Sequence, residues 1–326
     1  MFDFIARDWQ FIAKNAPWLI NTFAFLFGAI VGSFLNVCIW RMPRDESVIH
    51  PGSHCGSCNK PIRWYDNIPI ISFFALGGRC RSCGARYSGR YVMVEALTGI
   101  LFFLIWRQYG WTNPPLAIAY LIFASGCVVA AIIDLEHYII PDVITVGGTI
   151  VGVIYSALWP SLQVSTRMAD GLTESMLGIL VGSGIILWVM VIGEIVFQKE
   201  AMGFGDVKLM GAIGAFLGWQ ATVFTIAIGC VTGAVIGVGL LFWRKNADRE
   251  IQEDRHMDDA ELSYLIYGGT ENSSIPFGPF LIFGALVWVL LQEFTIGGQN
   301  IHLRTWMMEQ LGTFYCMPDP YPCMKP

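Results

Sequence analysis

Two aspartates at the ends of long apolar runs are the residues of this chain best suited to chemistry. Asp134 closes one apolar run, and Asp206 opens another directly after Gly203-Phe204-Gly205. A charge near the centre of a bilayer costs about 2.5–3.5 kcal/mol even on insertion scales, so such carboxylates usually face a protein interior or a cavity. Two carboxylates at the same depth can share one pocket, and such a pair suits peptide hydrolysis.

A carboxylate pair hydrolyses a peptide by sharing one proton, because two neighbouring carboxylates do not both ionise easily. The ionised member removes a proton from a water, which attacks the scissile carbonyl, and the protonated member hydrogen-bonds the carbonyl oxygen. The pair titrates as a unit, so neither Asp134 nor Asp206 is assigned a fixed role. A structural role stays open as well, since Asp206 suits the start of a helix.

Other carboxylates lie near the same helix ends but suggest a different use. Asp142 follows Pro141 at the start of an apolar run, where it is a natural helix cap. Glu95, Glu194 and Glu200 are interpreted as interface or packing carboxylates, with support of catalysis as the alternative.

A cysteine quartet forms the second constellation. It consists of two Cys-x-x-Cys pairs separated by 21 residues, namely Cys55 with Cys58 and Cys80 with Cys83. Two intervening residues let both thiolates of a pair point at one metal, and Asn59 and Gly84 then tolerate the left-handed backbone that turns the chain away. Four thiolates make a closed tetrahedral site, which predicts structural zinc. Two disulfides are the alternative, but a reducing compartment disfavours them.

The remaining cysteines carry less information. Three lie in apolar runs and are interpreted as small hydrophobic residues: Cys38, Cys127 and Cys230. Cys316 and Cys323 lie in a polar tail, where a disulfide and two free thiols are both open.

The elements that hold these residues are predicted to be membrane helices. The chain has 326 residues, of which 55% are hydrophobic and only 14% charged, whereas soluble domains average about a quarter charged. A spanning helix needs about 20 mostly apolar residues. Eight candidate runs meet or approach this length: 18–40, 91–106, 115–133, 139–159, 175–197, 206–219, 221–243 and 276–294.

The distribution of lysine and arginine predicts the orientation of these helices. Loop 41–90 carries eight basic residues against three acidic ones, so we expect it on the cytosolic side. The N-terminus is then outside, as is the tail after 295, while loop 134–138 and loop 198–205 face the cytosol with the aspartates. The basic residues cluster in this one loop, so no nucleic-acid partner is indicated, and no cleaved signal peptide is expected.

Glycines at regular spacing predict close helix packing in the later runs. The two sets are Gly211, Gly214, Gly218 and Gly229, Gly233, Gly237. The charged insert 244–275 is expected to be a solvated helix or a disordered loop.

These motifs, taken together, resemble the bacterial type IV prepilin leader peptidase and N-methyltransferase family, whose members are aspartyl proteases with a Gly-x-Gly-Asp element. The resemblance covers roughly residues 20–295, and its motifs occur in the order typical of the family. They are Gly32-Ser33-Phe34-Leu35-Asn36-Val37, Pro61 to Pro69, Gly78 to Gly84, Arg90-Tyr91 to Glu95, Asp134 to Ile140-Pro141-Asp142, and Met202-Gly203-Phe204-Gly205-Asp206-Val207-Lys208.

The resemblance implies an activity. Members cleave the basic leader of prepilins and of type II secretion pseudopilins, after a glycine and before a hydrophobic residue, at the cytosolic surface of the inner membrane. Many then N-methylate the new N-terminus with S-adenosylmethionine. The catalytic aspartates correspond to Asp134 and Asp206, and the zinc ligands to the four cysteines at 55, 58, 80 and 83. No glycine-rich nucleotide motif is found, so methylation rests on the resemblance alone.

The sequence departs from the family pattern in places that leave the aspartates untouched. Asn59 stands where glycine is frequent, no proline follows Cys55, and both the insert 244–275 and the tail are longer than expected. Three alternatives remain: a preflagellin or presenilin-like protease, a proton-coupled transporter, and a scaffold without activity. The cysteine pairs disfavour the first two, and no repeated halves support a transporter.

The predicted fold class is therefore an all-α polytopic membrane protein of about eight transmembrane helices with a small cytosolic zinc-ribbon-like loop domain. Its predicted segments are an N-terminal piece 1–17, a first span 18–40, a zinc-binding domain 41–90, a membrane peptidase domain 91–295 and a tail 296–326. Oligomeric state is not predicted.

Overall fold

The protein is described by a computed structural model that covers residues 15–163, 165, 167–198, 202–254, 276–296 and 299–302. The long helices are α2 (Pro17–Arg41), α4 (Arg90–Ile105), α5 (Pro114–His137), α6 (Asp142–Leu158), α7 (Met168–Phe197), α8 (Phe204–Asp254) and α10 (Gly278–Leu291). Short helical turns lie at Met42–Arg44, Trp64–Asn67, α3 (Ile71–Ala75), Trp106–Gly110 and Pro160–Gln163. Strands β1 (Glu293–Ile296) and β2 (Gln299–His302) pair antiparallel.

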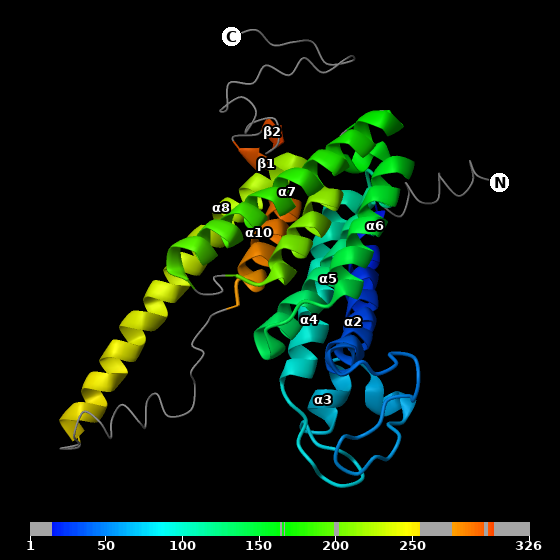
Figure 1. Ribbon diagram of the computed structural model, residues 1–326. Coiled ribbons are helices and arrows are strands. Elements are labelled where there is room, and N and C mark those ends of the chain that lie inside the picture. Colours follow the sequence, from blue (N-terminus) through cyan, green and yellow to red (C-terminus); the bar gives the residue numbers. More distant parts are fainter. Residues whose placement is uncertain are drawn as a thin grey trace.

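The helices form a bundle with a small lobe at one end (Figure 1). The lobe is the segment between α2 and α4, residues 42–89, and the β1–β2 hairpin lies at the opposite end of the bundle. The second half of α8 extends beyond the bundle on the side of the lobe. Residues 255–275 of the charged insert and the two tail cysteines, Cys316 and Cys323, lie outside the described residues.

Among the residues that the structure describes, five helices are long and apolar enough to cross a membrane: α2, α4, α5, α7 and α8. Helices α6 and α10 are apolar but shorter. The chain is thus a multi-pass helical membrane protein, and the expectation of about eight spans exceeds the five that meet the length criterion. The described residues are mostly helical, as predicted, except that the run 276–294 stops as a helix at Leu291 and is followed by the short β1–β2 hairpin.

Helix α8 consists of two helical segments that meet at Gly218, and it holds two of the apolar runs predicted from the sequence. Gly218 adopts a left-handed φ of 80° in its middle, which breaks the helical geometry between the runs 206–219 and 221–243. Only glycine adopts this conformation without a steric penalty. The break redirects the chain, which then runs beside α10 before the far end of α8 extends beyond the bundle (Figure 1).

Helices α7 and α8 approach each other through glycines. A Cβ atom placed on Gly214 would overlap the backbone of Gly178, and one placed on Gly211 would lie 2.9 Å from Ser183 Oγ. The predicted packing role of this first glycine set is therefore confirmed, except that Gly218 serves as the break. In the second set Gly229 and Gly233 face α10, whereas Gly237 meets open space.

The sequence motif Gly32 to Val37 on α2 provides the contacts that hold α2 against α4. Gly32 lies so close to α4 that a Cβ there would be 2.8 Å from the Cα of Glu95. Asn36 Nδ2 donates a 3.0 Å hydrogen bond to the carbonyl of Tyr91. Cys38 and Cys127 are buried in the core as expected, while Cys230 is exposed.

We expect Gly214→Ala to destabilise the protein, because the added methyl group overlaps backbone that cannot move away. Overpacking of this kind costs about 1–3 kcal/mol. Thermal unfolding in detergent should show a lower Tm for this variant.

The matched control is Gly184→Ala on α7, where an added Cβ meets no atom within 4 Å. That change should be neutral or raise Tm slightly, because alanine favours helix by roughly 0.5–1 kcal/mol over glycine. Equal Tm values for both variants would contradict the packing role of Gly214.

Candidate active site

The two aspartates singled out by sequence meet inside the bundle. Asp134 lies in the last turn of α5 and Asp206 in the first turn of α8. Their exposed fractions are 6% and 7%, and they are close enough for the charge of Asp134 to act on Asp206. Two carboxylates enclosed in this way do not both ionise readily.

The carboxylate of Asp134 is held by the start of another helix. The backbone N–H of Gly278, the first residue of α10, donates to it. A larger residue at this position would displace the Asp134 carboxylate, since a Cβ on Gly278 would overlap Asp134 Oδ2. A helix N-terminus carries a partial positive charge, which offsets the unfavourable placement of an acidic side chain at the C-terminal end of α5. That end is closed by Tyr138, whose left-handed backbone donates its N–H to the carbonyl of Asp134 at 2.9 Å.

A backbone turn positions Asp206, and one oxygen of its carboxylate has no hydrogen-bond partner among the described residues. Its backbone N–H donates to the carbonyl of Gly203 at 3.1 Å, which starts α8. Its buried Oδ1 has no hydrogen-bond partner within the part of the chain that the structure describes. A buried carboxylate oxygen without a partner is costly, and one beside a second carboxylate is suited to accept a proton from a reacting water.

The side chain of Ile140 packs near both the end of α5 that bears Asp134 and the start of α8 that bears Asp206. A Cβ on Gly205 would lie 3.4 Å from Ile140 Cβ, and one on Gly278 would lie 3.1 Å from Ile140 Cδ1. Both glycines therefore pack against the side chain of Ile140. Sequence reasoning missed Gly278, although Gly278-Pro279 has the signature of a helix start; it gave no indication that this helix start would lie beside Asp134.

The other predicted carboxylates do not join the pair. Asp142 Oδ1 accepts a 2.7 Å salt bridge from Lys208 Nζ and its side chain is 66% exposed. Glu95 is buried and accepts a 2.8 Å hydrogen bond from the backbone N–H of Ile70 in the lobe. Glu194 is exposed on α7, and Glu200 lies outside the described residues.

One contact ties the lobe to α4, and a second ties the start of α4 to the end of α5 that carries Asp134. Glu95 fixes Ile70, a β-branched residue with a left-handed φ of 62°, which needs support from its surroundings. Arg90, at the start of α4, forms an ion pair with Glu136, two residues beyond Asp134. The exit of the lobe is therefore anchored beside the carboxylate pair.

The four predicted cysteines converge in the lobe. Their sulfur atoms all lie within 4.8 Å of one another, and Cys55 Sγ and Cys83 Sγ are 3.8 Å apart. Four sulfurs at the usual zinc distance of about 2.3 Å in a tetrahedron would be separated by roughly 3.8 Å. The cluster therefore fits a metal ion of this kind.

The two Cys-x-x-Cys turns share one geometry. In each the residue after the second cysteine has a left-handed backbone, Asn59 with φ 55° and Gly84 with φ 73°. Its N–H donates to the carbonyl of the first cysteine, at 2.8 Å in one turn and 2.9 Å in the other. The predicted backbone turn after each pair is thus confirmed.

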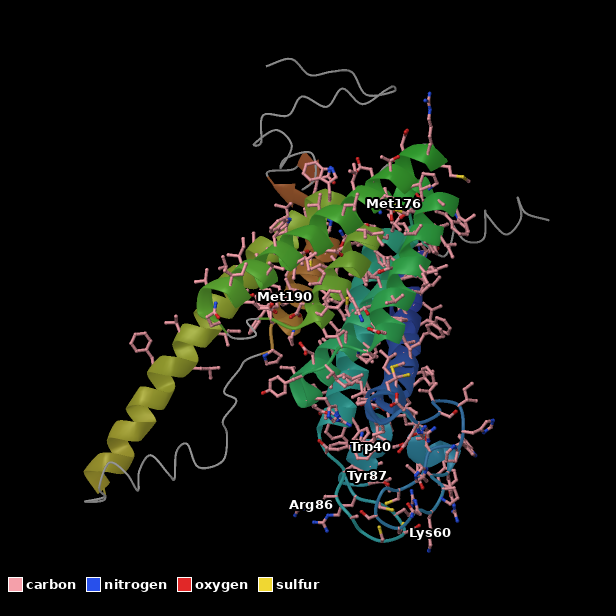
Figure 2. All side chains as sticks on the ribbon, in the orientation of Figure 1. Trp40, Lys60, Arg86, Tyr87, Met176 and Met190 are labelled. Carbon is pink, nitrogen blue, oxygen red and sulfur yellow. The ribbon has the colours of Figure 1, made fainter. Side chains whose placement is uncertain are left out.

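The pKa of the Cys83 thiol is raised to about 11, because a backbone hydrogen bond at Ala85 is outweighed by burial and by hydrogen bonds with the other sulfurs. Backbone N–H groups favour the thiolate form of two other cysteines. Those of Cys83 and Ser82 lower the pKa of the Cys80 thiol to about 6, and those of Cys58 and Ser57 lower the pKa of Cys55. Thiolates are the form that ligates metal. Basic side chains such as Lys60 and Arg86 project outward from the same lobe (Figure 2).

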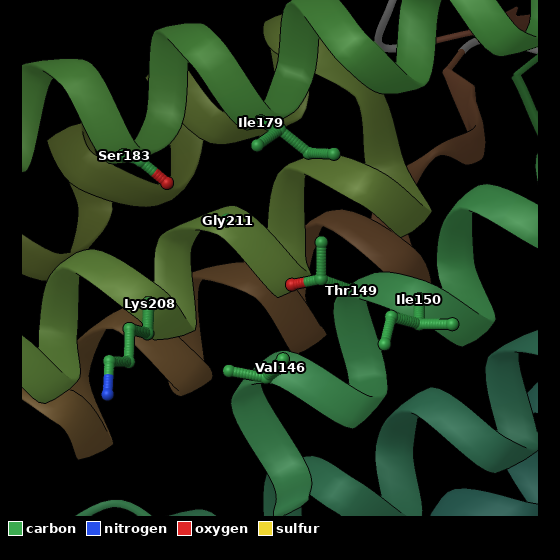
Figure 3. Close-up of a pocket in the computed structure, with 7 residues that line it drawn as sticks. All are labelled: Val146, Thr149, Ile150, Ile179, Ser183, Lys208 and Gly211. Carbon is green, nitrogen blue, oxygen red and sulfur yellow. The ribbon is translucent and has the colours of Figure 1, made fainter. Parts of the chain in front are cut away.

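A cavity of about 210 Å³ lies between α6, α7 and α8. Figure 3 shows Ile179 and Ser183 of α7 on one side, Val146, Thr149 and Ile150 of α6 on the other, and Lys208 and Gly211 between them. Its polar groups are already satisfied: Ser183 donates to the carbonyl of Val207, and Lys208 pairs with Asp142. The cavity therefore offers no reactive group.

Comparison with known proteins identifies two matching families in sequence order. Residues 26–109 match the bacterial peptidase A24 N-terminal domain, and residues 121–238 match the type IV leader peptidase family. No solved structure matches the chain.

Several curated relatives carry the corresponding names. A prepilin leader peptidase/N-methyltransferase of Myxococcus xanthus is 40% identical over 68% of this chain and 64% of its own length. A type 4 prepilin-like proteins leader peptide-processing enzyme of Escherichia coli O78:H11 is 32% identical over 86% of this chain and 97% of its own. A prepilin leader peptidase/N-methyltransferase of Aeromonas salmonicida is 31% identical over 85% and 94%. With its paired aspartates and cysteine lobe, the chain belongs to the type IV leader peptidase family.

Proposed function

We propose that this chain cleaves the leader peptides of prepilins and pseudopilins and methylates the N-terminus that cleavage exposes. The observation that carries the proposal is the meeting of Asp134 and Asp206, both buried, at adjoining helix ends. The names of the relatives supply the substrate class and the second activity.

In the proposed mechanism the aspartate pair holds one proton. Its ionised member takes a proton from a water, and the resulting hydroxide attacks the scissile carbonyl while the protonated member donates to the carbonyl oxygen. When the tetrahedral intermediate collapses, the C–N bond breaks and the aspartate that took the water's proton passes it to the departing N-terminal amine of the mature protein. The hydroxyl group of the intermediate returns a proton to the other aspartate as it becomes part of the leader's new carboxyl group, so the pair again holds one proton. The Gly278 N–H steadies Asp134 throughout, and the unpartnered Oδ1 of Asp206 is available to the water.

The proposed setting is the bacterial inner membrane, with the pair facing the cytosol. The lobe and the ends of α5 and α8 that bear the aspartates lie toward one end of the bundle (Figure 1), and the excess of lysine and arginine in residues 41–90 favours the cytosolic side for that end. Counting the two halves of α8 separately, and including α6 and α10, gives the proposed eight membrane segments.

We also propose that the lobe is a zinc-ribbon-like domain with structural zinc on the four cysteines. A segment of this size has little core of its own, and metal binding would supply its folding energy. Zinc in this position does no chemistry, because four sulfurs leave it no open coordination site. The cysteine lobe also separates this chain from a preflagellin or presenilin-like protease and from a proton-coupled transporter.

S-adenosylmethionine is the methyl donor that the family names imply. The apolar walls of the cavity between α6, α7 and α8 do not suit a charged nucleoside, and no residue is assigned to it. The proposal is tested by incubating the purified protein with a full-length prepilin and S-adenosylmethionine and measuring product mass. Loss of the leader together with the gain of one methyl group is expected.

We expect Asp134→Asn and Asp206→Asn each to reduce leader cleavage by at least about 100-fold, because each removes a proton-transferring group. Cleavage is measured with the same prepilin, and membrane insertion is checked by purification yield. Glu194→Gln on the exposed face of α7 is the control and should cleave normally. Normal processing by either aspartate variant would defeat the assignment.

Metal analysis of the purified protein should give one zinc per chain. Cys55→Ser combined with Cys58→Ser removes two thiolates and should lose the metal and make residues 42–89 sensitive to protease, since the ion supplies folding energy there. Cys230→Ser, on the exposed surface of α8, should keep both. Zinc retained by the double variant would show that the four sulfurs do not form the site.

A further inference from the structure

An ion pair joins the two chain segments that carry the aspartates. Lys208 Nζ, on α8, donates at 2.7 Å to Oδ1 of Asp142, the first residue of α6. Lys208 follows Asp206 by two residues, and Asp142 follows the short connection that leaves the end of α5, where Asp134 lies. The pair is therefore close in sequence to both aspartates, although neither of its side chains takes part in the proposed proton transfers.

The connection between α5 and α6 contacts the start of α8 at two points. At the first point Gly205 packs against Ile140, since a Cβ on the glycine would lie 3.4 Å from Ile140 Cβ. At the second point Lys208 pairs with Asp142. Asp206 lies between these two points on α8. Two contacts set the direction of a segment as well as its position, so together they orient the turn of α8 that carries the aspartate.

The charges of the ion pair are both held in place locally. Lys208 Nζ lies over the ring of Phe204, one turn earlier on α8, at 5.4 Å from the ring centroid, and a cation is attracted to an aromatic face. Its side chain points away from Ser183 of α7 (Figure 3). Asp142 lies in the first turn of α6, where the helix dipole favours a negative charge. Each partner is thus positioned before the pair forms.

The exposure of the pair separates an effect on rate from an effect on stability. The side chains of Lys208 and Asp142 are 31% and 66% exposed. Exposed ion pairs contribute little to stability, whereas a small displacement of a catalytic group can slow a reaction by about 100-fold. Loss of this pair should therefore leave the fold intact and still disturb the geometry of the aspartates.

We propose that Lys208 and Asp142 are positioning residues that hold Asp206 against Asp134 in the geometry that cleavage requires. The inference rests on the proposed function. The ion pair acts through the backbone of the first turn of α8 and through the connection to α6, which join it to one aspartate each. In this role neither Lys208 nor Asp142 contacts the substrate.

The test measures kcat and KM for prepilin cleavage. Lys208→Met and Asp142→Asn should each lower kcat by about ten-fold or more and leave KM unchanged, because the geometry of the aspartates is altered and substrate binding is not. The double variant should be no slower than either single variant, since all three lack the same contact. The Tm of each variant in detergent should stay close to that of the unaltered protein.

Two further variants serve as comparisons. Lys208→Arg keeps the positive charge and should retain most of kcat. Lys60→Met makes the same substitution at an exposed lysine of the lobe and should cleave normally, which controls for the loss of one positive charge.

Normal kcat for Asp142→Asn would overturn the proposal, because Lys208 would then act without its partner. Independent effects of the two changes in the double variant would overturn it too, as would a rise in KM with kcat unchanged. If Lys208→Met does not fold, Asp142→Asn decides the matter at the more exposed side chain. Failure of the unaltered protein to cleave any prepilin would instead reject the proposed function, and this inference with it.

Discussion

The burial of two carboxylates beside each other is the constraint on which the rest of the structure depends. Such a pair is unstable in an apolar bundle unless a proton, a dipole or a hydrogen bond compensates it. Here the compensation is partial and comes from backbone. The N-terminus of α10 donates to Asp134, while Asp206 opens α8 at its own positive end. One carboxylate oxygen is left unpaired among the described residues, so the backbone compensates the pair only in part.

The ends of α5, α8 and α10 can lie together only if these helices pack closely. Glycine allows the close approach, with Gly278 of α10 against Asp134 and Gly205 of α8 against Ile140. The same residue type permits the contact of α7 with α8 at Gly214 and the break at Gly218. Because small-residue packing is a main source of helix association in a bilayer, the glycines that shape the site also hold the bundle together.

The sequence located the aspartates and the cysteines better than it predicted the contacts around them. Asp134 and Asp206 were recognisable because each sits at the edge of an apolar run, and the cysteines because their spacing is a local property of the chain. The Gly278 contact, the Glu95–Ile70 bond and the Arg90–Glu136 pair were not predicted, since each joins segments distant in sequence. The run 276–294 was predicted as one span because hydropathy does not reveal where β-forming residues replace helix.

Two of the unpredicted contacts connect the lobe, through α4, with the part of the bundle that carries Asp134. Glu95 anchors the middle of the lobe to α4, and Arg90 joins the exit of the lobe to the end of α5, beside Asp134. A lobe with little core of its own would place these two anchors poorly if its chain were loose. A metal that folds the lobe would therefore also fix the end of the helix carrying Asp134, although four sulfurs exclude that metal from the reaction itself.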